Sequence, residues 1–186
     1  MKKWLLMSAA LALTACSSEK GAEYYQLPQP VQSMAASAAS TGQRQLWVEQ
    51  VSIPDYLAGN GIVYQTSDVQ YTIANSNLWA SPLDQQLKSS LVANLNSALP
   101  GWVVSSTPLG ASQESLNVNV TGFHGRYDGK VVVSGEWLLN RDGEITRRPF
   151  HLEMAQQGDG YPALVKTLGE AWQKESQQIA AQVAVR

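Results

Sequence analysis

The stretch Leu116–Leu139, LNVNVTGFHGRYDGKVVVSGEWLL, decides the fold of this chain. Its first half alternates apolar and polar residues, as does a strand that buries one face. Asp128-Gly129 lies between the two halves, and this dipeptide is a strong signal for a tight hairpin turn. The stretch therefore predicts two antiparallel strands, 116–127 and 130–139.

The register of this hairpin follows from the turn, and it pairs Tyr127 with Lys130. Farther from the turn, it pairs Val120 with Trp137. A slip of one residue would move every apolar side chain to the polar face, so the pattern strongly specifies the pairing. His124 falls on the apolar face, where we expect a satisfied histidine at the sheet margin. The apolar face also holds Leu116, Val118, Val120, Val131, Val133, Trp137 and Leu139, and the polar face holds Asn117, Asn119, Thr121, Lys130, Ser134, Glu136 and Asn140.

A third strand, Ile145–Met154, is predicted after the turn signal Asp142-Gly143. It completes a three-strand meander over residues 116–154. Proline cannot donate a hydrogen bond to a ladder, so Pro149 indicates an edge strand or a bulge. The residues on its apolar face are Phe150, Leu152 and Met154.

Shorter strands are predicted on the N-terminal side of the meander, where β-branched and aromatic residues gather between turn signals. Asn60-Gly61 is the strongest of these turn signals. The predicted strands are a short one near residues 24–27, then Gln45–Ile53, Ile62–Gln65, Val69–Ile73 and Trp102–Val104.

Two amphipathic helices are predicted from apolar residues at helical spacing. Ser81 can cap the first helix, Pro82 suits its first position, and Pro100-Gly101 ends it. The second runs from Tyr161 to about Val183. The apolar stripe of the first helix is Leu83, Leu87, Leu91, Leu95 and Leu99.

These elements predict a single α+β domain. Its sheet is mainly antiparallel, built from the meander 116–154 plus the N-terminal strands, and two amphipathic helices cover one face. Removing residues 1–15 leaves a length that suits one domain with a substantial core.

The N-terminus has the features of a secretory signal: Lys2, Lys3 and the apolar run Trp4–Leu13. The run is too short for a membrane-spanning helix, which needs about 20 residues. Leu13-Thr14-Ala15-Cys16 matches the bacterial lipobox pattern. We expect cleavage before Cys16, the only cysteine, which would then carry a diacylglycerol and an N-acyl chain. Two alternatives are an ordinary signal peptide, with Cys16 lost or incidental, and an uncleaved apolar helix.

The expected organisation is a signal peptide over residues 1–15, an acylated tether over 16–43 and a domain over 44–186. The tether is rich in Ser, Ala, Gln, Gly and Pro. In bacterial lipoproteins, a serine after the acylated cysteine usually directs the protein to the outer membrane, and Ser17 occupies that position.

Composition and motifs argue against several classes of function. Loss of Lys2 and Lys3 with the signal changes the formal net charge from −2 to −4, and no basic stripe indicates a nucleic-acid partner. His124 and His151 are the only histidines, and neither has a second ligand at suitable spacing, so no metal site is expected. No Gly-x-Ser-x-Gly motif or phosphate-binding glycine loop is present. We expect no catalytic residues and no cofactor.

The segment Asp55–Ala80 carries aromatic and apolar residues among Gly and Asn. One interpretation is a strand pair with these side chains in the core. The other is a partner-binding surface made by the Pro54–Gly61 loop and the Asn75–Trp79 connection. The candidate contact residues in the second interpretation are Tyr56, Leu57, Ile62, Tyr64 and Trp79.

The same segment resembles the ABC-type transport auxiliary lipoprotein family through Ile53–Leu57, Ile62–Ser67 and Asn77–Leu83. The lipobox, Tyr24–Pro28, Leu99–Val104, the hairpin and Gly135–Leu139 also share this likeness, which covers nearly the whole chain.

The resemblance implies a lipid-anchored outer-membrane protein that faces the periplasm. It implies as partners a PqiB-like protein with MCE domains, which forms a conduit, and a PqiA-like inner-membrane protein. The system would move lipids between membranes and support envelope integrity. A homo-oligomer, a periplasmic lipid carrier and an envelope hydrolase remain as alternatives.

Overall fold

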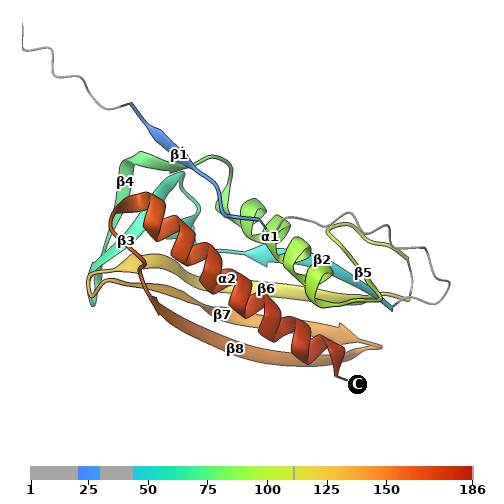
Figure 1. Cartoon of the computed structure of the whole chain (residues 1–186). Helices are drawn as coiled ribbons and strands as arrows, with labels where there is room; N and C mark the ends of the chain where they lie inside the picture. Colours follow the sequence, from blue (N-terminus) through green and yellow to red (C-terminus); the bar gives the residue numbers. More distant parts are fainter. Residues whose placement is uncertain (1–20, 30–43, 111, 186) are drawn as a thin grey trace, which may run out of the picture.

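The computed structural model describes residues 21–29, 44–110 and 112–185. The predictions for the signal peptide, for Cys16 and for most of the tether lie outside these residues. Figure 1 shows one twisted sheet with both helices on the same face. The predicted α+β class, with one domain and two helices over a sheet, is confirmed.

The sheet has eight strands among the described residues, in the order β1-β4-β3-β6-β2-β5, with β7 and β8 added beside β6. The strands are β1 (Glu23–Tyr25), β2 (Arg44–Ser52), β3 (Gly61–Ser67), β4 (Gln70–Trp79), β5 (Trp102–Ser105), β6 (Glu114–Arg126), β7 (Lys130–Arg141) and β8 (Glu144–Ala155). The helices are α1 (Leu83–Ala98), α2 (Gly160–Ala184) and the short 3-10 helix η1 (Asp55–Leu57).

The predicted meander is present as β6, β7 and β8, joined by antiparallel ladders. Pro149 lies in β8, which pairs only with β7 and is therefore an edge strand, as predicted. Phe150 and Leu152 on this strand point into the core. The alternating pattern thus placed the three strands correctly, together with the inward faces of β7 and β8.

The register of the hairpin differs from the predicted one. Val118 pairs with Trp137, two residues away from the predicted partner of Trp137. The loop has three residues rather than two, and it is closed by Gly129 at φ 78°, a conformation that glycine adopts easily. A bulge between Val120 and Gly122 adds the second shift.

The bulge also changes which side chains face the helices. Leu116, Val118 and Val120, which precede the bulge in β6, stay buried as predicted. Side chains alternate between the two faces of a strand, so a shift of two residues leaves them on the same face of the sheet. Beyond it, Phe123 enters the core and His124 turns to the helix-free face, so the predicted side for His124 was wrong. His124 is nevertheless only 3% exposed, because the Tyr71 ring lies edge-on against it at 5.1 Å.

Parallel pairing in the N-terminal half was not predicted. β2 lies parallel to both β5 and β6, β3 to β6, and β1 to β4. β2 pairs with one edge of β6 up to the pair Ser52–Asn119. Farther along the same edge, β3 pairs with β6 from the pair Tyr64–Gly125. A Cβ at Gly125 would lie 2.6 Å from the Tyr64 ring, so this junction requires glycine. The Asn75–Trp79 segment belongs to β4, so its predicted role as a connection was wrong.

The helices bury the predicted stripes against the sheet. All five leucines of the first stripe are in the core. Trp172 of α2 is fully buried between the layers, and its Nε1–H donates to the carbonyl oxygen of Leu87 at 3.2 Å. No side chain caps α1, so the predicted role for Ser81 was wrong. The Ser81 carbonyl oxygen instead accepts a hydrogen bond from the Gln86 side chain.

The short strand predicted near residues 24–27 is β1. Its chain continues into the core through Leu27, whose backbone N–H donates to the Gln86 side chain at 2.9 Å. Pro28 then lies against Gly169 of α2. These residues are therefore packed into the domain.

Candidate interaction surface at the tyrosine end

All seven tyrosines of the chain lie on elements that meet at one end of the sheet. We call this the tyrosine end. It comprises β1, η1, the β3–β4 hairpin, the β6–β7 turn and the start of α2, which lie together on the left of Figure 1. The tyrosines are Tyr24, Tyr25, Tyr56, Tyr64, Tyr71, Tyr127 and Tyr161.

Three of the five predicted contact residues lie beneath this surface. Leu57 and Ile62 are 1% exposed, and Trp79 is 4% exposed, because they fill the core under η1 and β3. Trp79 also lies 6.2 Å from the Phe123 ring. The structure therefore does not support the surface exposure on which the prediction for these three residues rested.

Tyr56 and Tyr64, the other two predicted contact residues, are half-buried and use their hydroxyl groups to bind strand β6. Tyr56 donates to the Thr121 carbonyl oxygen at 2.8 Å, and Tyr64 donates to that of Arg126 at 2.8 Å. Burial raises the pKa of Tyr56 to about 12, with a smaller contribution from Tyr71. The hydroxyl of Tyr56 is therefore a stable donor and not an acid at neutral pH.

An aromatic cluster covers the helix-free face at this end. Tyr56 and Tyr71 have ring centroids 5.1 Å apart, and Tyr71 lies against His124. Burial lowers the pKa of His124, so the ring is neutral at pH 7. Its Nδ1 is 3.0 Å from the Gly125 carbonyl oxygen. A neutral imidazole with one backbone partner is a packing residue here, as the sequence analysis expected.

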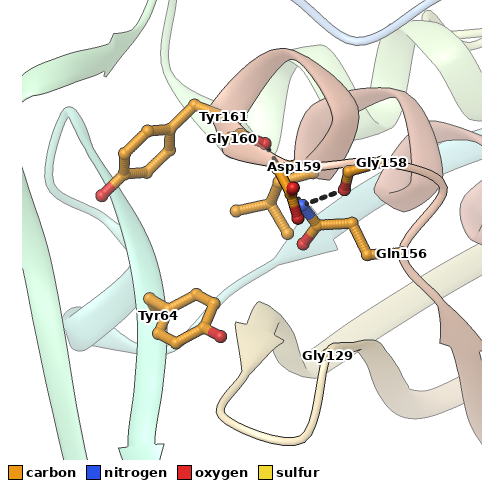
Figure 2. Close-up of a pocket in the computed structure, with 8 residues that line it drawn as sticks. Tyr64, Gly129, Gln156, Gly158, Asp159, Gly160 and Tyr161 are labelled. Carbon is orange, nitrogen blue, oxygen red and sulfur yellow. Dashed lines mark hydrogen bonds between the residues drawn. The ribbon is translucent and has the colours of Figure 1, made fainter.

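A cavity of about 440 Å³ opens between the start of α2 and the β6–β7 turn (Figure 2). Tyr64 and Tyr161 line it together with Leu164. Gln156 at its rim donates to the Gly158 carbonyl oxygen at 2.9 Å and holds the loop that begins the helix. Its volume falls in the range of ligand pockets. Asp159 is the only charged residue in its lining, so the cavity does not favour an anion.

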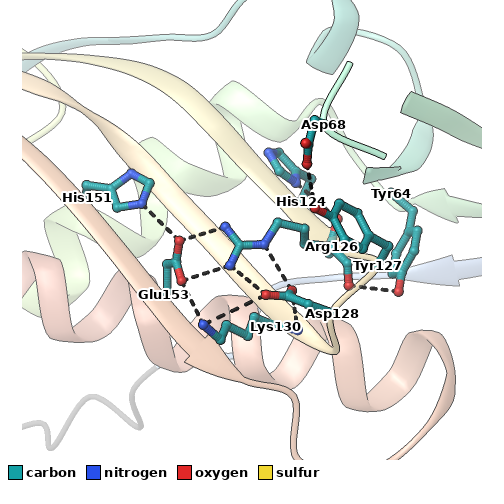
Figure 3. A network of polar contacts seen from close by, with 10 residues as sticks. Tyr64, Asp68, His124, Arg126, Tyr127, Asp128, Lys130, His151 and Glu153 are labelled. Atoms are coloured by element: carbon teal, nitrogen blue, oxygen red, sulfur yellow. Dashed lines mark hydrogen bonds and ion pairs between the residues drawn. The ribbon is translucent and has the colours of Figure 1, made fainter. Parts of the chain in front are cut away.

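A polar network fastens the hairpin tips at the tyrosine end (Figure 3). Arg126 binds Glu153 through two contacts of 2.6 and 2.8 Å and also binds Asp128. Lys130 lies 3.0 Å from Glu153. Hydrogen bonds from Arg126 hold the pKa of Glu153 well below its usual range. The four charges balance one another, which makes the network a structural clamp.

The β3–β4 hairpin is held beside this clamp by the hydrogen bond from Tyr64 to the Arg126 carbonyl oxygen and by a contact at its tip. The Tyr127 hydroxyl, on the β6–β7 turn, donates to Asp68 at the tip of the hairpin. The hydrogen bond to Asp68 raises the pKa of Tyr127, and the negative charge of that carboxylate adds to the effect because it disfavours ionisation of the phenol. The two tips therefore lie side by side.

Metal-binding clusters are not found in the part of the chain that the structure describes. Within it, no three His, Cys, Asp or Glu residues gather as metal ligands. Over the same residues, no helix has the length and apolar character needed to cross a bilayer.

One buried ionisable residue was missed by the sequence analysis. Glu175 of α2 is 1% exposed, and its Oε2 has no hydrogen-bond partner. Burial raises its pKa to about 7. The available signal was its position between Trp172 and Ile179 on the apolar stripe of the helix.

The fold defines a two-layer α+β module, with two helices on one face of a mixed eight-stranded sheet among the described residues. The family model for the ABC-type transport auxiliary lipoprotein component matches residues 25–180, so the chain belongs to that family. The family resemblance seen in the sequence is thereby confirmed, and a transport component of this kind is not an enzyme.

Two curated relatives cover nearly the whole chain. Each is called intermembrane transport lipoprotein PqiC, one from Escherichia coli (strain K12) and one from Shigella flexneri. Both are 63% identical over 184 residues, which is 98% of this chain and 98% of each relative.

Two solved structures share the fold. A crystal structure of an uncharacterized protein is 62% identical to this chain, with a TM-score of 0.81. The match covers 89% of this chain and 100% of the chain in that structure. A crystal structure of a Xanthomonas campestris protein is 17% identical, with a TM-score of 0.68 over 87% of this chain and 94% of its own. The second likeness shows the fold alone.

Proposed function

We propose that this protein is the lipid-anchored outer-membrane component of an MCE-type intermembrane lipid transport system. The observation that carries the proposal is the 63% identity, over 98% of the chain, to proteins named intermembrane transport lipoprotein. Family membership and the lipobox at Leu13–Cys16 agree with it. The domain faces the periplasm, docks a PqiB-like MCE conduit and supports envelope integrity.

The packing of the core favours a docking role over a carrier role. Trp172 and Phe123 are fully buried and fill the space between the helices and the sheet. The cavity of Figure 2 is open to the surface and meets this core only at its edge, through Leu164. A protein that carried lipid alone would need an enclosed apolar volume of acyl-chain size.

Membrane attachment through Cys16 is tested by Cys16→Ser. We expect the variant to accumulate as an uncleaved precursor or to appear in the soluble periplasmic fraction, because the thiol that accepts the diacylglycerol is gone. Fractionation, with mass spectrometry of the wild-type N-terminus, measures this. Mature-sized variant that stays in the outer membrane would contradict the anchor.

Docking of the conduit is proposed for the Pro54–Gly61 loop, with Tyr56 as the contact side chain and Tyr64 as a further candidate on the helix-covered side of β3. Leu57, Ile62 and Trp79 support the loop from beneath. We expect Tyr56→Asp to reduce co-purification with the MCE-domain partner at least tenfold, because a charge replaces an aromatic contact. Co-purification from cells that express both proteins measures this.

The matched control is Tyr56→Phe, which removes the hydrogen bond to Thr121 but keeps the ring. It should retain partner binding. Circular dichroism of both variants checks that the fold is intact. Wild-type recovery of the partner with Tyr56→Asp would place docking elsewhere.

A further inference from the structure

The tip of the β3–β4 hairpin exposes apolar side chains that lie outside the hydrophobic core. Val69 occupies the turn and is 91% exposed. Tight hairpin turns favour Gly, Asn and Asp, so turn chemistry does not explain a valine here. Tyr71 and Ile73 follow at alternate positions of β4 and are 43% and 48% exposed. We call these three residues the apolar row, and a group of exposed apolar side chains is a recognised sign of an interaction surface.

The hairpin is open along one edge. β4 pairs with β3 on one side, and β1 covers the other side only at residues 77–79. In the described part of the chain, no strand pairs with that edge of β4 over residues 70–76. Both the apolar row and the bare edge therefore need something to cover them.

The lipid anchor is attached at the same end. Glu23 of β1 is seven residue steps along the chain from Cys16, which gives a maximum extended reach of about 25 Å. Glu23 pairs with Asn77 of β4, and eight residues of strand from there to Val69 span about 26 Å. Because the two lengths match, the acyl chains on Cys16 and the hairpin tip can enter the same bilayer surface.

The residue types at this end suit the boundary between lipid and water. Tyrosine combines an apolar ring with a polar hydroxyl, and it is enriched where membranes meet water. Tyr24 on β1 is 67% exposed, and Tyr127 on the neighbouring turn is 52% exposed. The charges of the clamp are paired internally, so they add little repulsion from anionic lipid.

We propose that Val69 and Ile73 of the hairpin, together with Tyr24, contact the lipid surface of the membrane that holds the anchor, while Tyr71 stays packed against Tyr56 and His124. This rests on the proposed acylation of Cys16. The contact orients the domain, with the β3–β4 tip toward the lipid and the β7–β8 turn pointing away into the periplasm. The membrane contact thus fixes the orientation of the domain relative to the bilayer.

The test is site-specific labelling of the full acylated protein in vesicles of phosphatidylethanolamine and phosphatidylglycerol. Acylated Cys16 has no free thiol, so Val69→Cys provides a single site for an environment-sensitive NBD dye. Ile145→Cys is the matched control: it is 64% exposed but lies at the far end of the meander, beside Asn140. The length of β6, about 40 Å, separates the two ends.

We expect the dye at position 69 to emit at shorter wavelength and to be quenched at least fivefold more by doxyl-labelled lipid than the dye at position 145. A second pair of proteins carries the dye at Ile73→Cys, with either Val69 or Val69→Asp in the turn. Quenching by doxyl-labelled lipid should be at least threefold weaker in the protein with Val69→Asp. Equal, weak quenching at positions 69 and 145 in vesicles that float with the protein would overturn the contact while leaving the anchor intact. Failure of the wild-type protein to float would overturn the anchor, and the contact with it.

Discussion

Glu175 is the residue whose environment is least suited to its chemistry. It lies on the apolar stripe of α2, with one carboxylate oxygen unpaired. Burial raises its pKa from 4.5 to about 7. An unfolded chain releases this proton near pH 4.5, whereas the folded chain holds it to about pH 7. Stability therefore falls as pH rises from about 4.5 to 7, and the total loss is about 3 kcal/mol.

Replacing this carboxyl by an amide should remove the pH dependence. We expect Glu175→Gln to raise the free energy of unfolding by about 2 kcal/mol at pH 8 and to change it little at pH 5, because the native glutamate is already protonated there. Urea unfolding of the soluble domain at both pH values measures this. Glu170→Gln, on the same helix but less buried, is the control and should change stability by less than about 0.5 kcal/mol. An equal gain at pH 5 and pH 8 would contradict the assignment.

Individual residues were predictable from the sequence where a local period determined their burial. The leucines of α1 and the inward residues of β8 belong to this class. Glu175 was missed because a glutamate on a helix is normally exposed. His124 was placed on the wrong face because the bulge near Thr121 leaves no mark in the alternation of apolar and polar residues.

At the scale of the elements, α2 packs unusually closely against the segment that follows β1. A Cβ at Gly169 would lie 2.7 Å from Cδ of Pro28. Glycine in a helix normally costs about 1 kcal/mol relative to alanine. The close approach reverses this preference, because Pro28 and the helix leave no room for a methyl group.

Gly169→Ala should therefore destabilise the protein by about 1–2 kcal/mol instead of stabilising it. In a Pro28→Gly background the clash is absent, and the same substitution should become neutral or stabilising. A double-mutant cycle measured by urea unfolding gives the coupling directly. If Gly169→Ala has the same effect in both backgrounds, the contact between Pro28 and Gly169 does not limit the helix position.

The sequence predicted which helices and strands exist better than it predicted which strands pair with one another. Helix and strand periods are local properties, and the hairpin loop signal joins neighbouring strands, so α1, α2 and the β6–β7–β8 meander were found. The parallel pairing of β2 with β5 and β6 joins strands that are far apart in the sequence. No local pattern in one sequence specifies such pairing. The extension of β4 to Trp79 was missed for a related reason, since its last residues pair with β1.

At the scale of the whole molecule, the sequence predicted the helix layer and the sheet layer. It did not predict which residues of the candidate site would be buried between them and which would be exposed. Leu57, Ile62 and Trp79 were candidates for the surface because loops often carry binding residues. They are buried because η1 and the end of β4 close the core at this end of the sheet. The exposed residues Val69 and Ile73 were assigned only to a strand, since an apolar residue in a strand pattern is expected to be buried.

The boundary of the folded domain is the last feature to test at this scale. The expected boundary lay at residue 44, whereas Leu27 is 3% exposed in the core and binds Gln86. The backbone carbonyl oxygen of Tyr25 also accepts a hydrogen bond from the Ala80 N–H at 2.8 Å. Removal of β1 and Leu27 would expose core surface, leave buried polar groups of α1 unpaired and uncover the last residues of β4.

We therefore expect a chain that begins at Gly21 to be as stable as the mature protein, because it keeps β1 and all of its contacts. A chain that begins at Arg44 should lose at least about 3 kcal/mol, since burial of Leu27 alone contributes about 2 kcal/mol and the lost hydrogen bonds about 1 kcal/mol each. Urea unfolding of both chains, with amide hydrogen exchange at the β4 edge, measures the difference. If the two chains unfold with the same free energy, the segment before residue 44 is only a tether, and the orientation proposed for the membrane-bound domain loses its rigid link through β1.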